Sequence, residues 1–460
     1  MQKLWRLHPN DPQAVQRLAR DSGVSLTVAQ LLLNRGINQA GEAKRFLDGT
    51  LSELHNPHSL PNVPDAADRI LQAVLDRKKI CIFGDYDADG VTGTAILMTL
   101  FRALGHTATY YVPNRMEEGY GVNTEALDTL KADGIELVIT VDCGIASLAE
   151  ADHAKAIGLD FIVTDHHEMK DSLPAASCLV HPRLPGSAYP FDGLSGAGVA
   201  FKLAWAVAMR ASGSERVTPI LREYLLDATG LAALGLVADV MPLRDENRIL
   251  VRKGLDRLVA KPSIGMNALV VASGLGDAKS IKAEDVAYKL APRLNAAGRL
   301  GCARLVVELL TTENPERARE LAEYLDGQNK QRQTIERKIG YQARERITVS
   351  QMEHEPALVL ENAEWHQGVI GVVAGRLCEQ YGKPTVLIAT GDGLGLASGS
   401  GRSVAGCPLH ELLIECSDLL ASHGGHAAAA GLKIDPKNVP AFREKFTAAV
   451  KSRFPNGTPA

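Results

Sequence analysis

Three carboxylates at alternating positions form the densest group of chemistry-bearing residues in this sequence. They are Asp85, Asp87 and Asp89, in the segment GDYDADG between an apolar run and a helical pattern. Like charges this close raise one another's pKa, and a divalent cation is the natural compensation. The spacing also opens a calcium-binding EF-hand loop, but the glutamate that such a loop needs at its twelfth position is replaced by Ile96. A solvated acidic turn remains the alternative for this segment taken alone.

Further polar residues directly follow two apolar, β-rich runs. Asp142 follows LVITV, and Asp165-His166-His167 follows FIVT. Open parallel sheets gather their ligands at the carboxyl ends of the strands, so these side chains are expected to converge with the three carboxylates. Taken singly, Asp142 fits a helix N-cap and the histidines fit a polar turn. Adjacent histidines are expected to aim at different points, one at a metal ion and the other at the substrate as a hydrogen-bond donor or acid.

A further carboxylate, Asp239, ends the apolar helical run GLVA and fits the same cluster. Many carboxylates with one or two imidazoles and no thiolate suit Mn²⁺ or Mg²⁺ better than structural zinc. Two ions about 3.5–4 Å apart would generate a hydroxide, orient a phosphate and stabilise the departing oxygen. The residues therefore predict hydrolysis of a phosphoester or phosphoanhydride.

The elements that must position these residues alternate between strand and helix patterns. Strands are expected at 80–83, 109–112, 137–141 and 161–164, with helices after Thr92 and from Thr124. This alternation predicts an α/β fold with a parallel sheet. Short helices before it, in residues 1–78, are expected to form an N-terminal cap.

The second half of the chain is expected to hold a connector and a smaller domain. Helical patterns dominate from Gly196 to Leu310, and the charged stretch 314–347 predicts a long connecting helix, with a plain surface helix as the alternative. Strand patterns at 357–360, 384–389 and 394–398, beside helices near Gly368 and Pro408, predict a second, smaller α/β domain. The expected boundaries are 1–78, 79–310, 311–348 and 349–460.

Bulk composition narrows the class of protein. The 460 residues exceed what one hydrophobic core usually supports, and no run of about 18 apolar residues could span a bilayer. The N-terminus lacks the features of a signal peptide, and the seven scattered cysteines form no CxxC pair, so a reduced cytoplasmic location is expected. A net charge of -4 argues mildly against a DNA partner and requires any such binding to use a local basic groove.

Several motifs in order resemble those of the DHH phosphoesterases, which are named for the triplet Asp165-His166-His167. The set GDYDADG, VDCG, TDHH, GLVADVMPL and APRLNAAGR is similar to the RecJ exonucleases of that superfamily, over about residues 79 to 432. The resemblance implies a parallel-sheet DHH domain joined by a long helix to a smaller α/β DHH-associated domain. It also implies a metal site with the ligands Asp87, Asp89, Asp142, His166 and Asp239, with Asp85 close by and His167 near the scissile phosphate.

One position departs from the pattern of small-substrate relatives. Family II inorganic pyrophosphatases carry a histidine four residues before the metal-binding aspartate of the first motif, whereas this chain has Phe83 there. Asp85 is expected to take the place of that ligand.

Substrate contacts are also implied by the resemblance. In the second domain, the segments containing Ser400, Arg402 and His426 are similar to the DHH-associated domain, and their Gly-Ser stretch is expected to close its backbone N–H groups on a phosphate. A plain Gly-Ser turn is the alternative. Further phosphate contacts along the DNA are implied for Arg115, Arg293, Asn295 and Arg299, and a surface salt bridge is the alternative for the arginines. Tyr120 is placed either to stack a base or to pack.

The function implied is a metal-dependent 5′–3′ exonuclease on single-stranded DNA that releases 5′-mononucleotides in DNA repair and recombination. The partners implied are single-stranded DNA, single-strand-binding protein and recombination helicases, with no membrane. Longer RecJ proteins continue into an OB-fold module that this sequence does not include, so weaker, salt-sensitive DNA binding is expected. The rivals are a DHH phosphodiesterase acting on short oligonucleotides or cyclic dinucleotides, and a non-catalytic replication scaffold. The first would be shorter, without cap and connector, and the second would have lost ligands.

Overall fold

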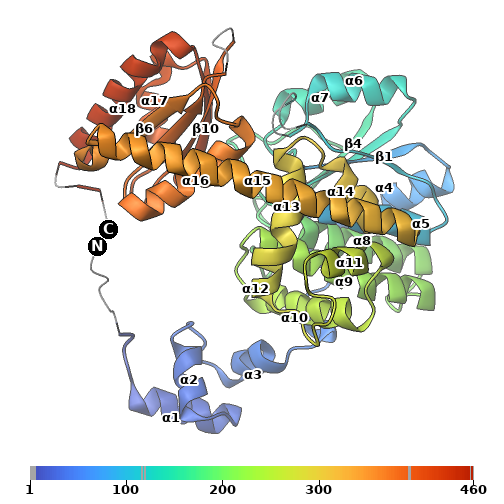
Figure 1. Ribbon diagram of the computed structural model, residues 1–460. Coiled ribbons are helices and arrows are strands. Elements are labelled where there is room, and N and C mark those ends of the chain that lie inside the picture. Colours follow the sequence, from blue (N-terminus) through green and yellow to red (C-terminus); the bar gives the residue numbers. More distant parts are fainter. Residues whose placement is uncertain (1–6, 115–117, 119–120, 392–394, 456, 459–460) are drawn as a thin grey trace. The chain divides into compact units, whose positions relative to one another are not determined.

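The computed structural model describes residues 7–114, 118, 121–391, 395–455 and 457–458 (Figure 1). The chain divides into two compact units. The first holds most of the chain up to Glu323, and the second holds Tyr324 onward together with Ala296–Cys302 and a short segment at Asn114. The predicted domain boundaries at 78, 310 and 348 remain predictions.

A five-stranded parallel sheet organises the first unit. Its strands are β1 (Ile80–Gly84), β2 (Thr109–Tyr111), β3 (Leu137–Val141), β4 (Asp160–Thr164) and β5 (Cys178–Val180), in the order β2-β1-β3-β4-β5. β1 and β3 are buried along their whole length, which explains why they are apolar runs without alternation. The four predicted strands are confirmed. β5 was not predicted.

Helices cover both faces of this sheet. One face packs under α6 (Thr124–Ala132) and α7 (Leu148–Ala156), in a core that includes Phe83 and Phe161. The helices that contact the sheet in the other layer are α4 (Val63–Leu75), α5 (Ala88–Ala103) and α8 (Gly196–Ser212). The predicted α/β class is therefore confirmed.

The remaining helices of the first unit form layers around α5 and α8. α9 (Pro219–Ala238) packs on both, and α10 (Asp245–Ala260) packs on α9. At the N-terminus, three helices share a small core of their own, α1 (Pro12–Ser22), α2 (Leu26–Leu33) and α3 (Ala40–Asp48). The later part of the unit contains α11 (Ile264–Ala272), α12 (Ala283–Asp285), the π-helix η3 (Val286–Leu290), the first half of α13 (Ala291–Arg299) and α14 (Arg304–Thr311). The second half of α13 belongs to the second unit.

The long charged helix predicted at 314–347 is present as α15, Pro315–Val349, and it continues from the first unit into the second. The second unit has a mixed sheet, β6 (Leu358–Asn362), β7 (Thr385–Ala389), β8 (Ala397–Arg402), β9 (Ser422–Gly425) and β10 (Ala429–Ile434), in the order β6-β7-β8-β10-β9. α15 and α16 (Gln367–Tyr381) share one core with this sheet. α17 (Leu409–Glu415) and α18 (Val439–Arg453) share the other.

No helix in the described ranges is long and apolar enough to cross a membrane.

Candidate metal centre

The acidic loop after β1 is held by its own carboxylates. Asp87 is the N-cap of α5, and its Oδ1 accepts hydrogen bonds from the backbone N–H groups of Asp89 (2.9 Å) and Gly90 (3.1 Å). This cap starts α5 at Ala88, so the expectation of a helix only after Thr92 was wrong. Asp89 consequently lies in the first turn of the helix, where its carboxylate is buried.

The ends of β3 and β4 deliver the next side chains to the same edge. Asp142 directly follows β3, and its backbone N–H donates to the carbonyl of Thr164, the last residue of β4. Asp142 has a φ of +64°, a left-handed conformation that Asp and Asn adopt more readily than most residues. Asp239 arrives from another direction as the C-cap of α9.

The side chains predicted to converge do lie together. His166 Nε2 is 3.1 Å from Asp142 Oδ1, 3.6 Å from Asp239 Oδ2 and 3.9 Å from Asp89 Oδ2. Three sets of side chains have ligand atoms within 4.8 Å of one another, and two sets share Asp142 while two share His166. The sets are Asp85, Asp87 and Asp142; Asp89, His166 and Asp239; and Asp142, His166 and His167.

The two histidines lie close together, and whether they aim at different points remains a prediction. Their rings lie 4.5 Å apart between centroids, and His167 Nδ1 is 3.8 Å from the same Asp142 oxygen that His166 approaches. The cause is the turn at Asp165, whose Oδ1 accepts from the backbone N–H groups of both His166 (2.7 Å) and His167 (3.1 Å). This Asx-type turn bends the chain so that successive side chains fall on one side.

Asp165 also orients His167, a role that the sequence did not reveal. Its Oδ1 lies 2.8 Å from His167 Nδ1, and its Oδ2 accepts from the backbone N–H of Ile145 at 2.9 Å. Burial alone would lower the pKa of His167, but the hydrogen bond and charge of Asp165 outweigh it and raise that pKa to about 9. Burial would likewise raise the pKa of Asp165, yet the bond to His167 brings it down to about 2. The two side chains form an imidazolium–carboxylate pair at neutral pH.

The N-terminus of α8 holds Asp89. Ser195 Oγ donates to Asp89 Oδ1 at 2.8 Å, and the backbone N–H groups of Gly196 and Ala197 donate to the carboxylate at 2.6 and 3.1 Å. Sequence reasoning missed this support. The available signal was Ser195 before the small-residue run GAG, a pattern typical of a helix N-terminus that binds an anion.

The electrostatics of the cluster favour a cation. Burial, followed by the charges of Asp239 and Asp87, raises the pKa of Asp89 to about 8. Burial, followed by the charge of Asp89, raises the pKa of Asp142 well above its ordinary value. Burial and the charge of Asp87 raise the pKa of Asp239 to about 6. Burial and the charge of the neighbouring His167 lower the pKa of His166 to about 3. The buried carboxylates repel one another and resist ionisation, and the imidazole beside them is neutral. A divalent ion bound among them would offset this repulsion and allow the carboxylates to ionise.

Two buried atoms at the centre of the cluster provide a direct test of fit. Asp142 Oδ1 and His166 Nε2 lie 3.1 Å apart without the geometry of a hydrogen bond, and neither atom has a hydrogen-bond partner elsewhere in the described part of the chain. Buried polar atoms are normally satisfied, and these are a carboxylate oxygen and an imidazole nitrogen, both ligands of Mn²⁺ and Mg²⁺ sites. The donor set therefore fits a divalent metal centre.

Phe83, which stands where small-substrate relatives carry a histidine, belongs to the core of the first unit. Phe83 is fully buried and stacks on Tyr111, with ring centroids 5.1 Å apart, in the core under α6 and α7. Asp85 instead has an oxygen within 4.8 Å of those of Asp87 and Asp142. This placement supports Asp85 as the substitute for the missing ligand.

Close packing around the carboxylates leads to a first testable prediction. A Cβ added to Gly235 on α9 would lie 2.3 Å from Asp89 Oδ1 and 2.6 Å from the Ala197 Cβ. We expect Gly235→Ala to displace Asp89 and weaken Mn²⁺ binding by at least about tenfold, measured by isothermal titration calorimetry. The matched control is Gly327→Ala on α15, where nothing lies within 4 Å of the new Cβ, and its Mn²⁺ affinity should be unchanged. Equal affinities for the two variants would contradict the packing argument.

The three residues of α13 that were predicted to contact substrate each make a different hydrogen bond within the protein. Asn295 Oδ1 accepts from the backbone N–H of Ala88 at 2.8 Å, so Asn295 supports the start of α5. Arg293 Nη1 donates to the carbonyl of Lys289 at 2.6 Å, and Arg299 Nη1 donates to the carbonyl of Gly368 at 3.3 Å within the second unit. Arg115 and Tyr120 lie outside the described residues.

The Gly-Ser segment of the second unit is strand β8, so the expectation that its backbone closes on a phosphate was wrong. β8 is paired along Ala397–Arg402 with β10 and along Ser398–Arg402 with β7, and these ladders use its backbone. The expected strand at 394–398 therefore begins later, at Ala397, while residue 394 lies outside the described ranges. Glycine suits this strand because a Cβ on Gly399 would lie 2.6 Å from Leu432.

The side chains of β8 nevertheless share one face. Ser398, Ser400 and Arg402 alternate with buried residues, and Ser400 and Arg402 lie against α16 at Gly371. Arg402 Nη1 donates to Ser400 Oγ (3.2 Å) and to the carbonyl of Gly401 (2.7 Å). His426 is exposed in the turn between β9 and β10, where its backbone N–H donates to Ala429.

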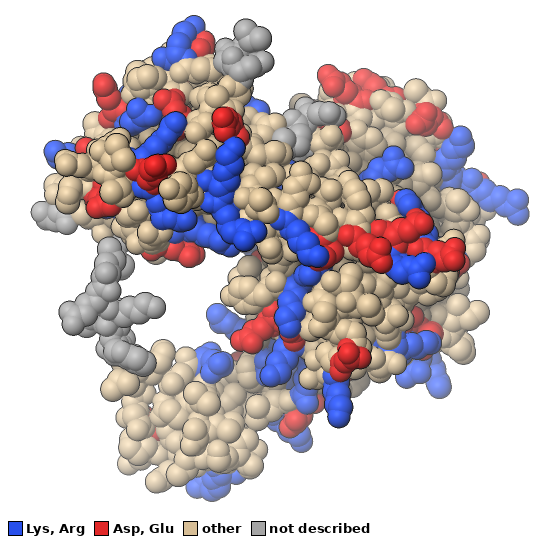
Figure 2. Space-filling view, viewed as in Figure 1, with Lys and Arg blue, Asp and Glu red and all other residues tan. Residues whose placement is uncertain are grey.

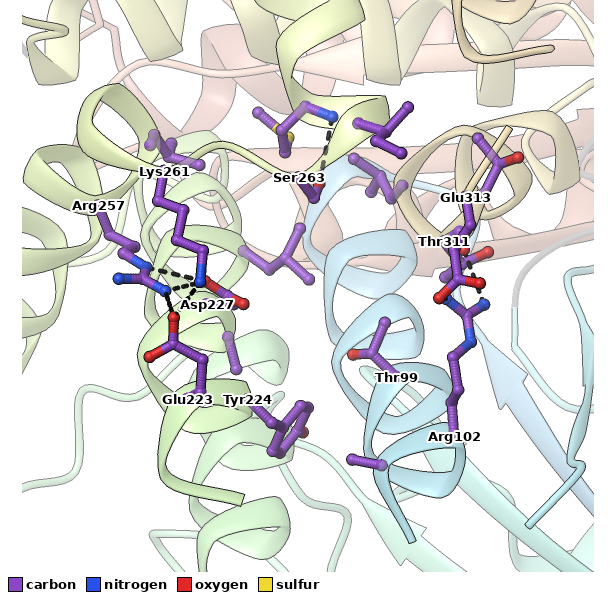
Figure 3. A pocket seen from close by; sticks show the side chains of 18 of the residues that line it. Thr99, Arg102, Glu223, Tyr224, Asp227, Arg257, Lys261, Ser263, Thr311 and Glu313 are labelled. Atoms are coloured by element: carbon purple, nitrogen blue, oxygen red, sulfur yellow. Dashed lines mark hydrogen bonds and ion pairs between the residues drawn. The ribbon is translucent and has the colours of Figure 1, made fainter. Parts of the chain in front are cut away.

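The first unit also contains a mainly apolar cavity of about 660 Å³, which lacks the crowded aspartates and histidines of the strand-end cluster (Figure 3). It lies among α5, α9, α10, α11 and α14, and no histidine or cysteine lines it. Arg257 pairs with Glu223 and Asp227 on one side, and Arg102 pairs with Glu313 on the other. Its charges are neutralised in pairs, so the candidate chemistry belongs to the strand-end cluster.

Comparison with known proteins agrees with this geometry. The model of the DHH family, N-terminal domain, matches residues 79–233, and that of the DHHA1 domain matches residues 349–452. The single-stranded-DNA-specific exonuclease RecJ of Escherichia coli K12 is 37% identical over 428 residues, covering 91% of this chain and 73% of that protein. The chain belongs to the RecJ family.

Other RecJ proteins are similar over nearly the whole chain. The single-stranded-DNA-specific exonuclease RecJ of Bacillus subtilis is 40% identical over 442 residues, which are 96% of this chain and 54% of that protein. This chain thus spans about half the length of that relative. The structure of Thermus thermophilus RecJ in complex with Mn²⁺ superposes with a TM-score of 0.84 at 34% identity, covering 98% of this chain and 63% of that one. The predicted resemblance to RecJ and the predicted DHH and DHH-associated architecture are confirmed.

Proposed function

We propose that this RecJ-family chain is a metal-dependent exonuclease that hydrolyses phosphodiester bonds of single-stranded DNA from the 5′ end and releases 5′-mononucleotides in DNA repair and recombination. The observation that carries the proposal is the strand-end cluster, in which five aspartates and two histidines have ligand atoms within 4.8 Å of one another in overlapping sets. The curated relatives described as single-stranded-DNA-specific exonucleases support the substrate and the reaction.

Asp87, Asp89, Asp142, His166 and Asp239 are the proposed ligands of two Mn²⁺ or Mg²⁺ ions, with Asp85 beside Asp87 and Asp142. Solved RecJ structures that contain Mn²⁺ and Mg²⁺ support this choice of metals. When bound, such ions supply a hydroxide near neutral pH and offset the negative charge of the phosphate.

His167 is the proposed catalytic side chain that faces the scissile phosphate. Asp165 fixes the ring through Nδ1, and in the metal-free protein its hydrogen bond and charge raise the pKa of His167 to about 9. A positioned imidazolium can donate a hydrogen bond to a phosphate oxygen and stabilise negative charge that develops there. Asp165 acts through His167 and is a positioning residue.

Substrate contacts are proposed for Arg115, Arg293, Asn295 and Arg299, and in the second unit for Ser400, Arg402 and His426. The residues of the second unit would bind substrate through their side chains, because the backbone of β8 already pairs with β7 and β10. Ser400 positions the Arg402 guanidinium, whose planar fork suits the oxygens of a terminal phosphate.

We therefore expect Arg402→Ala to weaken binding of oligonucleotides with a 5′-phosphate more than those with a 5′-hydroxyl. Loss of one charge-assisted contact should cost about 1.5–3 kcal/mol. Lys433→Ala is the control, since Lys433 lies on the adjacent strand β10 and contacts Ser398. If Arg402→Ala weakens both oligonucleotides equally, Arg402 does not recognise the 5′ end.

The proposed setting is the cytoplasm, where the seven cysteines, all free in the structure, stay reduced. Single-strand-binding protein and recombination helicases are proposed partners, because an exonuclease restricted to single strands depends on proteins that open and hold them.

One assay tests the function and its rivals. The protein is incubated with Mn²⁺ or Mg²⁺ and with end-labelled single-stranded DNA, duplex DNA, RNA, a dinucleotide and a cyclic dinucleotide. We expect single-stranded DNA to be degraded fastest, with mononucleotides released from the 5′ end. Faster hydrolysis of a dinucleotide or cyclic dinucleotide would favour the small-substrate enzyme, and no hydrolysis of any substrate would favour the scaffold.

A further inference from the structure

The C-terminal part of α15 carries a row of exposed side chains on one face, within the second unit. Its members follow one another at spacings of three or four residues, which places them along one side of a helix. All are exposed, and we call them the α15 stripe: Lys330, Thr334, Arg337, Tyr341, Arg344 and Thr348.

Charge is distributed unevenly along α15. Residues 324–349 contain six Lys or Arg and three Asp or Glu, while residues 315–323 contain two and three, in a chain whose net charge is -4. In Figure 2, acidic side chains gather near the Pro315 end of the helix and basic ones over its middle. Of the three acids in the basic part, Glu336 is buried and binds Arg332 and Arg376, so it does not neutralise the stripe. A local basic surface is what a polyanion requires of an acidic protein.

The cations of the stripe are accessible. Lys330 is 74% exposed although it pairs with Asp326 at the preceding turn. Arg337 contacts the Gln333 carbonyl and the Thr334 hydroxyl, and neither Arg337 nor Arg344 forms an ion pair with a carboxylate in the described part of the chain. The three cations stand seven residues apart, or about 10.5 Å per step along the helix.

Tyr341 lies between Arg337 and Arg344 and is 66% exposed. Packing does not require an aromatic ring at such a position. A ring flanked by cations offers a face on which a nucleic-acid base stacks, whatever the base, while the cations bind the adjacent phosphates.

We propose that the α15 stripe is an accessory binding site for single-stranded nucleic acid, separate from the metal cluster, which holds part of a long substrate outside the active site. The inference rests on the proposed function, because single-stranded DNA is the proposed substrate. It predicts that the stripe affects the use of long strands and leaves the chemistry and the shortest substrates unchanged.

The test replaces the three cations by glutamine, as Lys330→Gln, Arg337→Gln and Arg344→Gln together. Glutamine is a good helix former, so α15 should remain folded, and circular dichroism checks this. For a 30-nucleotide strand, the logarithm of the binding constant should depend on the logarithm of salt with a slope shallower by about two, since each single-strand phosphate contact contributes about 0.7. KM for the same strand should rise about tenfold or more at low salt with kcat unchanged, and dinucleotide hydrolysis should stay the same.

The charge-matched control is Lys437→Gln, Lys445→Gln and Lys451→Gln, which removes three cations from η6 (Pro436–Asn438) and α18. This variant should behave like the unmodified protein. Tyr341→Ala alone should weaken the 30-nucleotide strand about fivefold or more and should affect duplex DNA of equal length less, because paired bases cannot stack on the ring.

Three outcomes would overturn the inference: an unchanged KM and salt slope in the triple glutamine variant, equal losses in the two triple variants, or dinucleotide hydrolysis that falls as much as hydrolysis of the long strand. Failure of the proposed function is a different result, because then the unmodified protein would not degrade single-stranded DNA at all.

Discussion

Asp142→Asn is expected to lower hydrolysis of single-stranded DNA by more than about a hundredfold while leaving the fold intact. Asp142 contributes to two of the three sets of ligand atoms, and its Oδ1 lies 3.1 Å from His166 Nε2. An amide at this position is a much weaker metal ligand and carries no charge. Single-turnover rates at saturating DNA, with Mn²⁺ varied, measure the loss.

The choice of asparagine follows from the backbone. Asp142 has a φ of +64°, and asparagine tolerates the left-handed region far better than alanine, so a loss of activity is not confused with backbone strain. His166→Ala should lose activity to a similar degree, since His166 also belongs to two sets. Asp133→Asn is the control, because Asp133 is an exposed C-cap on α6. Near-normal activity in Asp142→Asn would rule out the proposed metal site.

The metal-free protein should lose stability as pH rises from about 6.5 to 9. Asp89, with a pKa of about 8, Asp142, with a raised pKa, and His167, with a pKa of about 9, all hold protons more tightly when folded than when unfolded. Their stabilising effect is complete below their unfolded values, near 4 for Asp and 6.5 for His, and is lost as pH rises through the folded values. The lowered pKa of His166 acts only below about pH 6.5, outside this window.

Thermal unfolding in EDTA, followed by circular dichroism at several pH values, measures this effect. We expect Tm to fall by about 5 °C or more between pH 6.5 and 9, and Mn²⁺ to raise Tm more at pH 8 than at pH 6.5. Asp142→Asn, which removes one of the crowded charges, should unfold at a higher temperature than the unmodified protein at pH 8 without metal. A Tm that is independent of pH and of Mn²⁺ would mean that the carboxylates are solvated and do not form a metal site.

The sequence was sufficient to predict the central strands of the first sheet because they are almost wholly buried. Runs such as LVITV and FIVT identify β3 and β4 without ambiguity, and the rule for parallel sheets then places Asp142 and Asp165 at the same edge. The convergence of these side chains was therefore predictable without knowledge of any distance, whereas the set of metal ligands was implied only by the resemblance to RecJ. The roles of the individual residues remain predictions.

What sequence reasoning missed depends on backbone hydrogen bonds and short pairings. The Asx-type turn of Asp165 sets the direction of both histidines, and no spacing rule contains that information. The Gly-Ser segment of β8 was interpreted as a backbone loop that closes on a phosphate, with a plain turn as the alternative, but its small residues fit between β7 and β10. The contacts of Ser195 and Asn295 join segments more than a hundred residues apart and appear only in the folded chain.

The close contacts of the glycines around the carboxylates also determine which substitutions the chain can accept. A Cβ on Gly90 would lie 2.6 Å from the Asp85 carbonyl oxygen, and one on Gly196 would lie 2.5 Å from the Asp142 Cβ. In a library of variants selected only for folding, Asp85 should change more freely than Asp87, because removing crowded charge relieves the metal-free fold whereas Asp87 is also the N-cap of α5. The glycines should remain. The motif thus meets two separate requirements, carboxylates for the proposed metal site and glycines for close packing, and a relative that had lost the carboxylates would still keep the glycines.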